Sequence, residues 1–186
     1  FLCAKDTVEK LNADITLFYN DYNMFFTDKR QAALALVESI NTYATDENGN
    51  YRKLIDGIGM QGYIGGYGKQ QDCPEDSHIT RIQASINLYA RAGMQVHITE
   101  MAVRNFLDDE ATIALHADFY GRLFEMFKTV NSGENKPLTC VAIWGVMDAP
   151  TATGYNYNLL SPYGGLITEK YEIKTSFDTV HSVMSK

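Results

Sequence analysis

Cysteine is scarce in this sequence, and the three residues present form no metal or redox motif. Cys3, Cys73 and Cys140 lack CxxC spacing, so neither a zinc site nor a thioredoxin-like motif is expected. One pair could join in an oxidising compartment, but buried free thiols fit so few cysteines better. No run of about 18 apolar residues occurs, so we expect no membrane span.

Basic residues are also in short supply, with 16 lysines and arginines against 23 acidic residues and a net charge of −7. This charge repels phosphate backbones and anionic membranes, which argues against a nucleic-acid partner. A neutral polymer such as a polysaccharide fits the charge better. No GxGxxG or Walker pattern follows an expected strand, which weakens a nucleotide-binding interpretation.

The sequence pattern indicates alternating strands and helices within one globular domain. The apolar share of 45% and the charged share of 21% are ordinary, and 186 residues can bury a sizeable core. Strand-like runs recur roughly every 40 residues, as βα units do, and four units make half of a barrel of about 250 residues. We expect strands over 15–19, 55–61, 95–100 and 138–144, helices over 28–45, 77–92, 109–130 and 172–184, and the end of another helix over 1–11.

Polar side chains gather at the ends of these expected strands, the edge of a parallel sheet where substrates bind. Strict alternation along the third strand would place Ile98 and Glu100 on one face and His97 on the other. If Glu100 points into a barrel, His97 then points toward the helices, so the two residues make a poor metal pair. The clustered residues are those of 20–23 and 61–63, Glu100, Trp144 and Asp148.

Four short motifs occur in order near the strand ends. They are Asn20-Asp-Tyr-Asn23, Ile55-Asp-Gly-Ile-Gly-Met-Gln61, Ile98-Thr-Glu100 and Ile143-Trp-Gly145. Their order and spacing resemble strands five to eight of glycoside hydrolase family 10, the endo-1,4-β-xylanase family. The segment from Tyr163 to Tyr171, followed by a helix, is similar to the family's closing segment. The resemblance implies an α/β fold, a (β/α)8 TIM barrel, of which residues 1–186 form the C-terminal half.

The resemblance also implies retaining hydrolysis of β-1,4-xylosidic bonds by two carboxylates about 5–5.5 Å apart, with no metal or organic cofactor. Glu100 matches the family's nucleophile. The acid/base Glu belongs to the fourth strand, which is not in this sequence, so the isolated chain should not hydrolyse xylan. A half barrel would expose strand edges, so we expect the N-terminal half in the same or another chain. A polymeric substrate implies a secreted, periplasmic or cell-surface location.

Other binding roles carry over from the family motifs. Asn20 and Tyr22 share the inward parity and would line the subsites near the cleaved bond. Gln61 would hydrogen-bond the sugar or the nucleophile. Trp144 would form an apolar platform beneath the sugar, since sugar rings have apolar C–H faces.

The sequence departs from the family pattern at two coupled positions. Tyr63 stands where a His is common, and Ala102 stands where an Asp is common; in the family these two groups interact with the nucleophile. We hypothesise that the Tyr63 hydroxyl, protonated at neutral pH, donates a hydrogen bond to Glu100 instead. A second tryptophan common after the eighth strand is also absent, and Tyr155 and Tyr157 occur there.

Three functions stay open: a xylanase, a hydrolase of a related β-1,4-glycan such as a β-glucanase, and a non-catalytic polysaccharide-binding barrel. An intact Glu100 argues against the last, because a pure binder needs no carboxylate at the attack position. Other polar residues have structural interpretations. Asp148 is expected to cap a loop, Asp21 to play a structural part, and the three helical histidines to pack or face solvent; these are His78, His116 and His181.

Overall fold

Four parallel strands form one sheet in the order β1-β2-β3-β4, in a computed structural model that describes residues 1–65, 75–149 and 162–186. Each strand pairs in parallel with the next one along the chain. This order is that of consecutive strands in a barrel and confirms the predicted βα repeat. The strands are β1 (Phe18–Tyr22), β2 (Gly57–Ile64), β3 (Gln95–Val103) and β4 (Leu138–Ile143).

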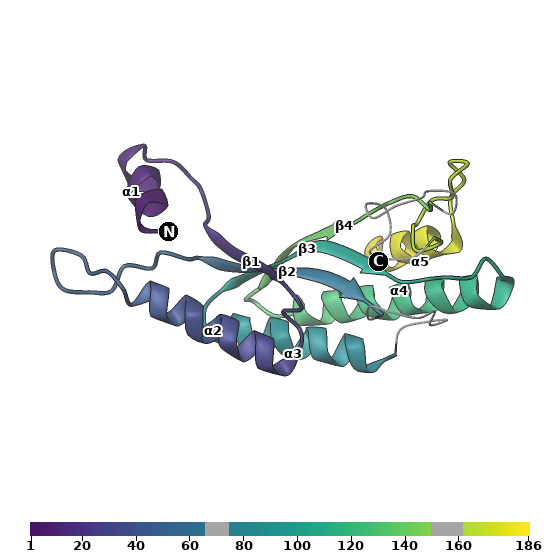
Figure 1. The fold of residues 1–186 in the computed structure, drawn as a ribbon, viewed down its shortest axis with the longest axis horizontal. Helices are drawn as coiled ribbons and strands as arrows, with labels where there is room; N and C mark the ends of the chain where they lie inside the picture. Colours follow the sequence, from purple (N-terminus) through teal and green to yellow (C-terminus); the bar gives the residue numbers. More distant parts are fainter. Residues whose placement is uncertain (66–74, 150–161) are drawn as a thin grey trace.

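The long helices α2, α3 and α4 cover one face of this sheet, and α5 packs beside α4 (Figure 1). The opposite face, which would line the interior of a closed barrel, is called the inner face below. Asp109 caps α4, because its carboxylate accepts a hydrogen bond from the Thr112 amide at 3.0 Å, and this bond lowers the pKa of Asp109. The helices are α1 (Leu2–Lys10), α2 (Thr27–Asn41), α3 (Ser77–Arg91), α4 (Glu110–Val130) and α5 (Thr175–Met184).

Several predicted boundaries were wrong by a few residues. The first strand was predicted over 15–19, but pairing with β2 begins at Phe18, opposite Gly57. Asn20 and Tyr22 therefore lie within β1 rather than after it. The helix predicted to reach Thr45 ends at Asn41, because Thr45 instead forms a single antiparallel bridge with Tyr51.

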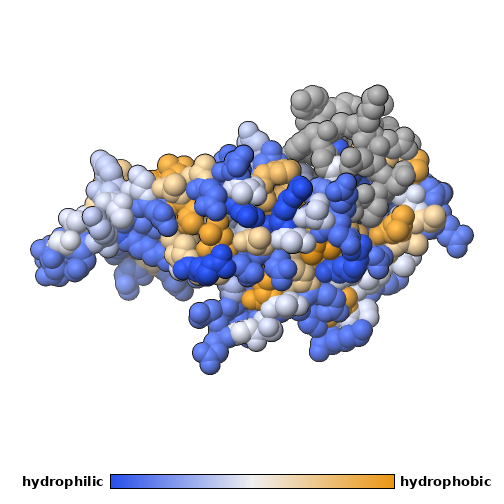
Figure 2. Space-filling model, turned by 90° about the horizontal axis from the view of Figure 1, so that it is seen from below, coloured by the Kyte–Doolittle hydropathy of each residue, from blue (hydrophilic) through white to orange (hydrophobic). Residues whose placement is uncertain are grey.

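The hydrophobic core lies between the sheet and the three long helices. Its strand side comes from alternating residues of β2 and β3, and each fully buried large side chain contributes about 1.5–3 kcal/mol. The helix outer surfaces are mostly hydrophilic with smaller hydrophobic patches (Figure 2), as expected for a surface facing water. The main core side chains are Ile58, Met60, Ile64, Val96, Ile98, Met101 and Val103 from strands, and Val37, Ile82, Ile86, Tyr89, Phe119, Tyr120 and Leu123 from helices.

A β-bulge in β3 overturns the predicted assignment of faces. Met60 pairs with Ile98, but the next residue, Gln61, pairs with Glu100, so Thr99 is one extra residue on β3. Ile98 therefore faces the helices and Glu100 faces the inner side, instead of sharing a face. His97 also lies on the inner face, where its ring stacks on Phe18 at 3.9 Å. The expectation that His97 points toward the helices was wrong because the bulge breaks strict alternation.

The helical histidines behave as packing or surface residues, as predicted. His116 is 1% exposed and packs edge-on against Tyr120 with ring centroids 5.0 Å apart. Its Nε2 lies 3.1 Å from the Val103 carbonyl oxygen, and burial lowers the pKa of His116 to about 4, so the ring is neutral at pH 7.

The prediction that the cysteines are buried free thiols was wrong for two residues. Cys3 and Cys140 are free but exposed, and Cys73 lies outside the described residues.

Candidate active site

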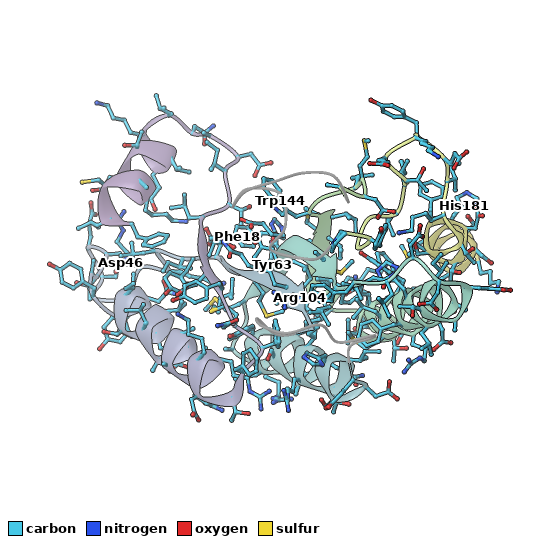
Figure 3. All side chains as sticks on the ribbon, turned by 45° about the vertical axis from the view of Figure 1, so that its right-hand side comes forward. Phe18, Asp46, Tyr63, Arg104, Trp144 and His181 are labelled. Carbon is cyan, nitrogen blue, oxygen red and sulfur yellow. The ribbon has the colours of Figure 1, made fainter. Side chains whose placement is uncertain are left out.

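The inner face carries one side chain from each successive strand in a row near the carboxyl ends of the strands. Tyr22 of β1 pairs with Gln61 of β2, and Gln61 pairs with Glu100 of β3. Trp144 follows β4 directly, and its amide donates to the Met101 carbonyl at 2.7 Å. In Figure 3, Tyr63 and Trp144 lie near the centre of the arc formed by the helices. The structure thus brings Tyr22, Gln61, Tyr63, Glu100 and Trp144 to the same end of the sheet.

Both carboxylate oxygens of Glu100 accept a hydrogen bond from β2. Gln61 Nε2 donates to Oε1 at 3.1 Å, and the Tyr63 hydroxyl donates to Oε2. The side chain is half-buried, so its contacts are partly shielded from water. These two donors hold the carboxylate in one orientation on the inner face, which is what a group attacking a fixed carbon atom requires.

The two positions that depart from the family pattern are direct neighbours. Tyr63 pairs with Ala102 across β2 and β3, and both are buried. The small Ala102 side chain leaves room for the phenol ring of Tyr63. The Tyr63 hydroxyl donates to Glu100, which lies on β3 two residues before Ala102. The hydrogen bond hypothesised from the sequence is therefore present.

Deeper on the inner face, two glycines of β2 let side chains from β1 and β3 meet above them. A Cβ on Gly57 would lie 2.2 Å from the Phe18 ring, and Phe18 stacks on His97. A Cβ on Gly59 would lie 2.4 Å from Asn20 Oδ1, and that oxygen accepts a hydrogen bond from the Thr99 hydroxyl at 2.6 Å. Asn20 is thus engaged with β3, a contact that the sequence did not indicate.

Tyr22 is held from the helix side by a cation. Lys29 Nζ lies 4.9 Å from the Tyr22 ring centroid and 2.5 Å from Asp21 Oδ2. The Lys29 ammonium lowers the pKa of Asp21, which also accepts a hydrogen bond from Tyr19 at 2.9 Å. Asp21 therefore has the structural part expected of it, and Tyr22 remains 54% exposed.

Trp144 and Asp148 begin the connection after β4 and differ sharply in exposure. Trp144 is 55% exposed, so much of its ring is open to solvent. Asp148 is buried, and its carboxylate accepts hydrogen bonds from the Gly165 amide at 2.8 Å and from Lys174 Nζ at 2.9 Å. Asp148 is thus a loop-capping residue, as predicted, rather than part of the row around Glu100.

Within residues 1–65, 75–149 and 162–186, no group of three or more His, Cys, Asp and Glu side chains is placed to hold a metal ion. The pairing of His97 with Glu100 was discounted for the wrong reason, since both lie on the inner face. In the same ranges, no helix is long and apolar enough to cross a membrane. Tyr155 and Tyr157, which occur after the eighth strand, lie outside the described residues.

The arrangement offers a fixed, half-buried carboxylate between exposed aromatic rings. In comparisons with known protein families, the model of the family described as "Glycosyl hydrolase family 10" matches residues 1–182. The chain belongs to glycosyl hydrolase family 10. The family match covers all four strands and the row around Glu100, and it confirms the resemblance on which the TIM-barrel prediction depended.

The relatives of this family member are named for two different activities, xylanase and exoglucanase. A "Putative endo-1,4-beta-xylanase" from Caldicellulosiruptor saccharolyticus is 29% identical over 141 residues, covering 73% of this chain and 41% of the relative. "Exoglucanase XynX" from Acetivibrio thermocellus is 30% identical over 151 residues, covering 80% of this chain and 12% of the relative. The chain thus spans less than half the length of these relatives.

A solved structure supports the half-barrel fold. The glycosylated endo-β-1,4-xylanase of family 10 from Gloeophyllum trabeum superposes with a TM-score of 0.70 at 21% identity. The match covers 99% of this family member and 51% of the xylanase chain. The four-stranded parallel sheet therefore has the fold of half of a (β/α)8 barrel, with β1 and β4 as its end strands.

Proposed function

We propose that this chain is the C-terminal half of a retaining endo-β-1,4-xylanase and supplies its nucleophile, Glu100. The observation that carries the proposal is the carboxylate of Glu100, turned to the inner face and held by Gln61 and Tyr63. Family membership and the relative named as a xylanase support the choice of xylan. Action on a polymer outside the cell makes secretion or surface display part of the proposal.

The proposed chemistry proceeds in two displacements. A Glu100 oxygen forms a bond to the anomeric carbon while the glycosidic C–O bond breaks, and an acid protonates the leaving oxygen. The same acid, now a base, then removes a proton from the water that releases the sugar from Glu100. We assign the acid/base to the fourth strand of the complete barrel, upstream of the four strands described above.

The sugar is proposed to bind between the exposed rings of Tyr22 and Trp144. Trp144 would offer its apolar face to the sugar at the cleavage point, and Tyr22 would line the adjacent subsite. Asn20 and Gln61 would add polar contacts to the hydroxyls. Asn20 Oδ1 already accepts from Thr99, so its amide nitrogen is the group proposed to donate to the sugar.

The test is release of reducing ends by the full-length protein on xylan and on cellulose. We expect turnover of xylan, little turnover of cellulose, and no hydrolysis by the isolated 186-residue chain. Preference for cellulose would support the alternative β-glucanase function, which the relative named as an exoglucanase favours. Binding of either polymer without hydrolysis would leave the non-catalytic alternative.

Tyr63 gives a more specific prediction. Replacing Tyr63 by Phe in the full-length protein removes the donor to Glu100 Oε2 and keeps the ring against Ala102. A hydrogen bond to a charged group contributes about 1.5–3 kcal/mol, so kcat/KM on xylan should fall about 10- to 100-fold. Tyr43→Phe is the matched control, since Tyr43 is 77% exposed. Equal activity of the two variants, with unchanged pH–rate profiles, would remove Tyr63 from the site.

A further inference from the structure

We propose that Thr99 is a positioning residue for Glu100, and that its hydroxyl, bonded to Asn20 across β2, fixes the bulge that turns Glu100 to the inner face. The inference rests on the proposed hydrolase function and adds to it a residue that does not touch the sugar. It starts from three observations: the register of β3, the Thr99–Asn20 contact, and the space above Gly59.

The bulge decides which way Glu100 points. In a regular strand, residues two apart share a face, so Glu100 would point the same way as Ile98. Ile98 is 2% exposed and packs in the core beneath the sheet. A carboxylate there would be buried among apolar side chains and unavailable to a substrate. The extra residue, Thr99, removes this conflict, because Glu100 then pairs with Gln61 on the inner face.

The Thr99 hydroxyl anchors the bulge to a strand that is not its neighbour. Thr99 Oγ1 donates to Asn20 Oδ1 at 2.6 Å, and the two residues belong to β3 and β1. β2 lies between them, and the contact passes above Gly59. A Cβ on Gly59 would lie 2.4 Å from Asn20 Oδ1 and 3.0 Å from Thr99 Cγ2, so only glycine leaves room for this contact.

The two ends of the Glu100 side chain are thereby restrained separately. Thr99 fixes the backbone immediately before Glu100, and Gln61 and Tyr63 hold the carboxylate. The Thr99 contact sets where the side chain begins, and the two donors on β2 set where it ends. A nucleophile displaced by about 1 Å can lose 100-fold in rate, so loss of the Thr99 anchor should slow attack.

The experiment uses the full-length protein and compares Thr99→Val with Thr99→Ser. Valine keeps the shape of threonine and lacks the hydroxyl, whereas serine keeps the hydroxyl. We expect Thr99→Val to lower kcat on xylan about 10- to 100-fold with KM changed less than about twofold, and Thr99→Ser to stay near wild type. Thr129→Val, at an exposed position of α4, is the control for a threonine elsewhere.

Covalent labelling of Glu100 reads the position of the nucleophile directly. A 2-deoxy-2-fluoro-xyloside with a good leaving group should label wild type and Thr99→Ser at similar rates and Thr99→Val about 10- to 100-fold more slowly. Gly59→Ala, which displaces Asn20 from the β2 side, should slow labelling as well and serves if Thr99→Val fails to fold.

The outcomes separate the inference from the proposed function. Labelling of Thr99→Val at the wild-type rate, or equal slowing in Thr99→Val and Thr99→Ser, would overturn the role of the hydroxyl while leaving Glu100 as nucleophile. Wild-type protein that hydrolyses no glycan and carries no label on Glu100 would instead overturn the proposed function.

Discussion

Replacing Glu100 by Ala in the full-length protein is expected to abolish xylan hydrolysis, with kcat falling by about 10⁴-fold or more. The reason is that the first displacement needs a carboxylate oxygen to form the bond to the anomeric carbon. Glu100 is the carboxylate that Gln61 and Tyr63 hold on the inner face. The measurement is the rate of reducing-end release, with Glu125→Ala as control, since Glu125 is exposed on α4.

Small anions distinguish loss of the nucleophile from loss of the fold. In Glu100→Ala, azide can enter the space vacated by the carboxylate and attack an activated xyloside from the same side. We expect azide to restore part of the rate and to give a product of inverted configuration, because only one displacement then occurs. Undiminished hydrolysis by Glu100→Ala would show that another residue attacks the sugar.

Much of the fold could be predicted from the sequence, because each strand and helix of the βα repeat is indicated by residues that are close together in the chain. Helix α4 was predicted from Asp109 onward, since acidic residues open it and apolar residues recur along it. The first strand was placed three residues early, because β-rich composition begins before the pairing does. Phe18 is the first residue of that strand because Gly57 is its partner, and no local pattern encodes a partner 39 residues away.

Alternation along β3 was used to place His97 on the opposite face from Glu100, and that placement was wrong. Strict alternation tied Glu100 to Ile98, and the bulge at Thr99 separates them. A bulge depends on pairing with a neighbouring strand, so alternation within β3 alone cannot reveal it. The Tyr63–Glu100 contact was predictable because the family comparison showed two coupled departures at once. No departure from the family pattern indicated the Thr99–Asn20 contact, and its two residues lie 79 positions apart in the sequence.

The second large effect is expected from the buried ion pair of Asp148 and Lys174. Their side chains are only 4% and 6% exposed, and Lys174 Nζ lies 2.9 Å from both carboxylate oxygens. Lys174 also donates to the Tyr163 carbonyl at 2.8 Å, and Asp148 accepts from the Gly165 amide. The pair therefore joins the connection that begins at Trp144 to the segment that leads into α5.

Replacing Lys174 by Met should lower the free energy of unfolding by about 3–5 kcal/mol, because it leaves a buried carboxylate without its cation. Burial raises the pKa of Asp148 even with Lys174 present. With Lys174 gone, the carboxyl should hold a proton in the folded state up to a higher pH than in the unfolded state. The stability loss should therefore be smaller at pH 4 than at pH 7, a difference that denaturant unfolding at the two values measures.

The double variant Asp148→Leu/Lys174→Met distinguishes two causes of instability, an unpaired buried charge and the loss of a contact between two segments. Removing both charges should restore most of the loss, since a buried ion pair is often matched by apolar residues of similar size. Arg122→Met is the exposed control, and loss of its surface contacts to Asp118 and Asp76 should cost about 1 kcal/mol or less. If the double variant were as unstable as Lys174→Met alone at pH 7, the cause of the instability would be loss of the contact between the two segments. The unpaired buried carboxylate of Asp148 would then not be the cause. The connection carrying Trp144 would then depend on the ion pair itself.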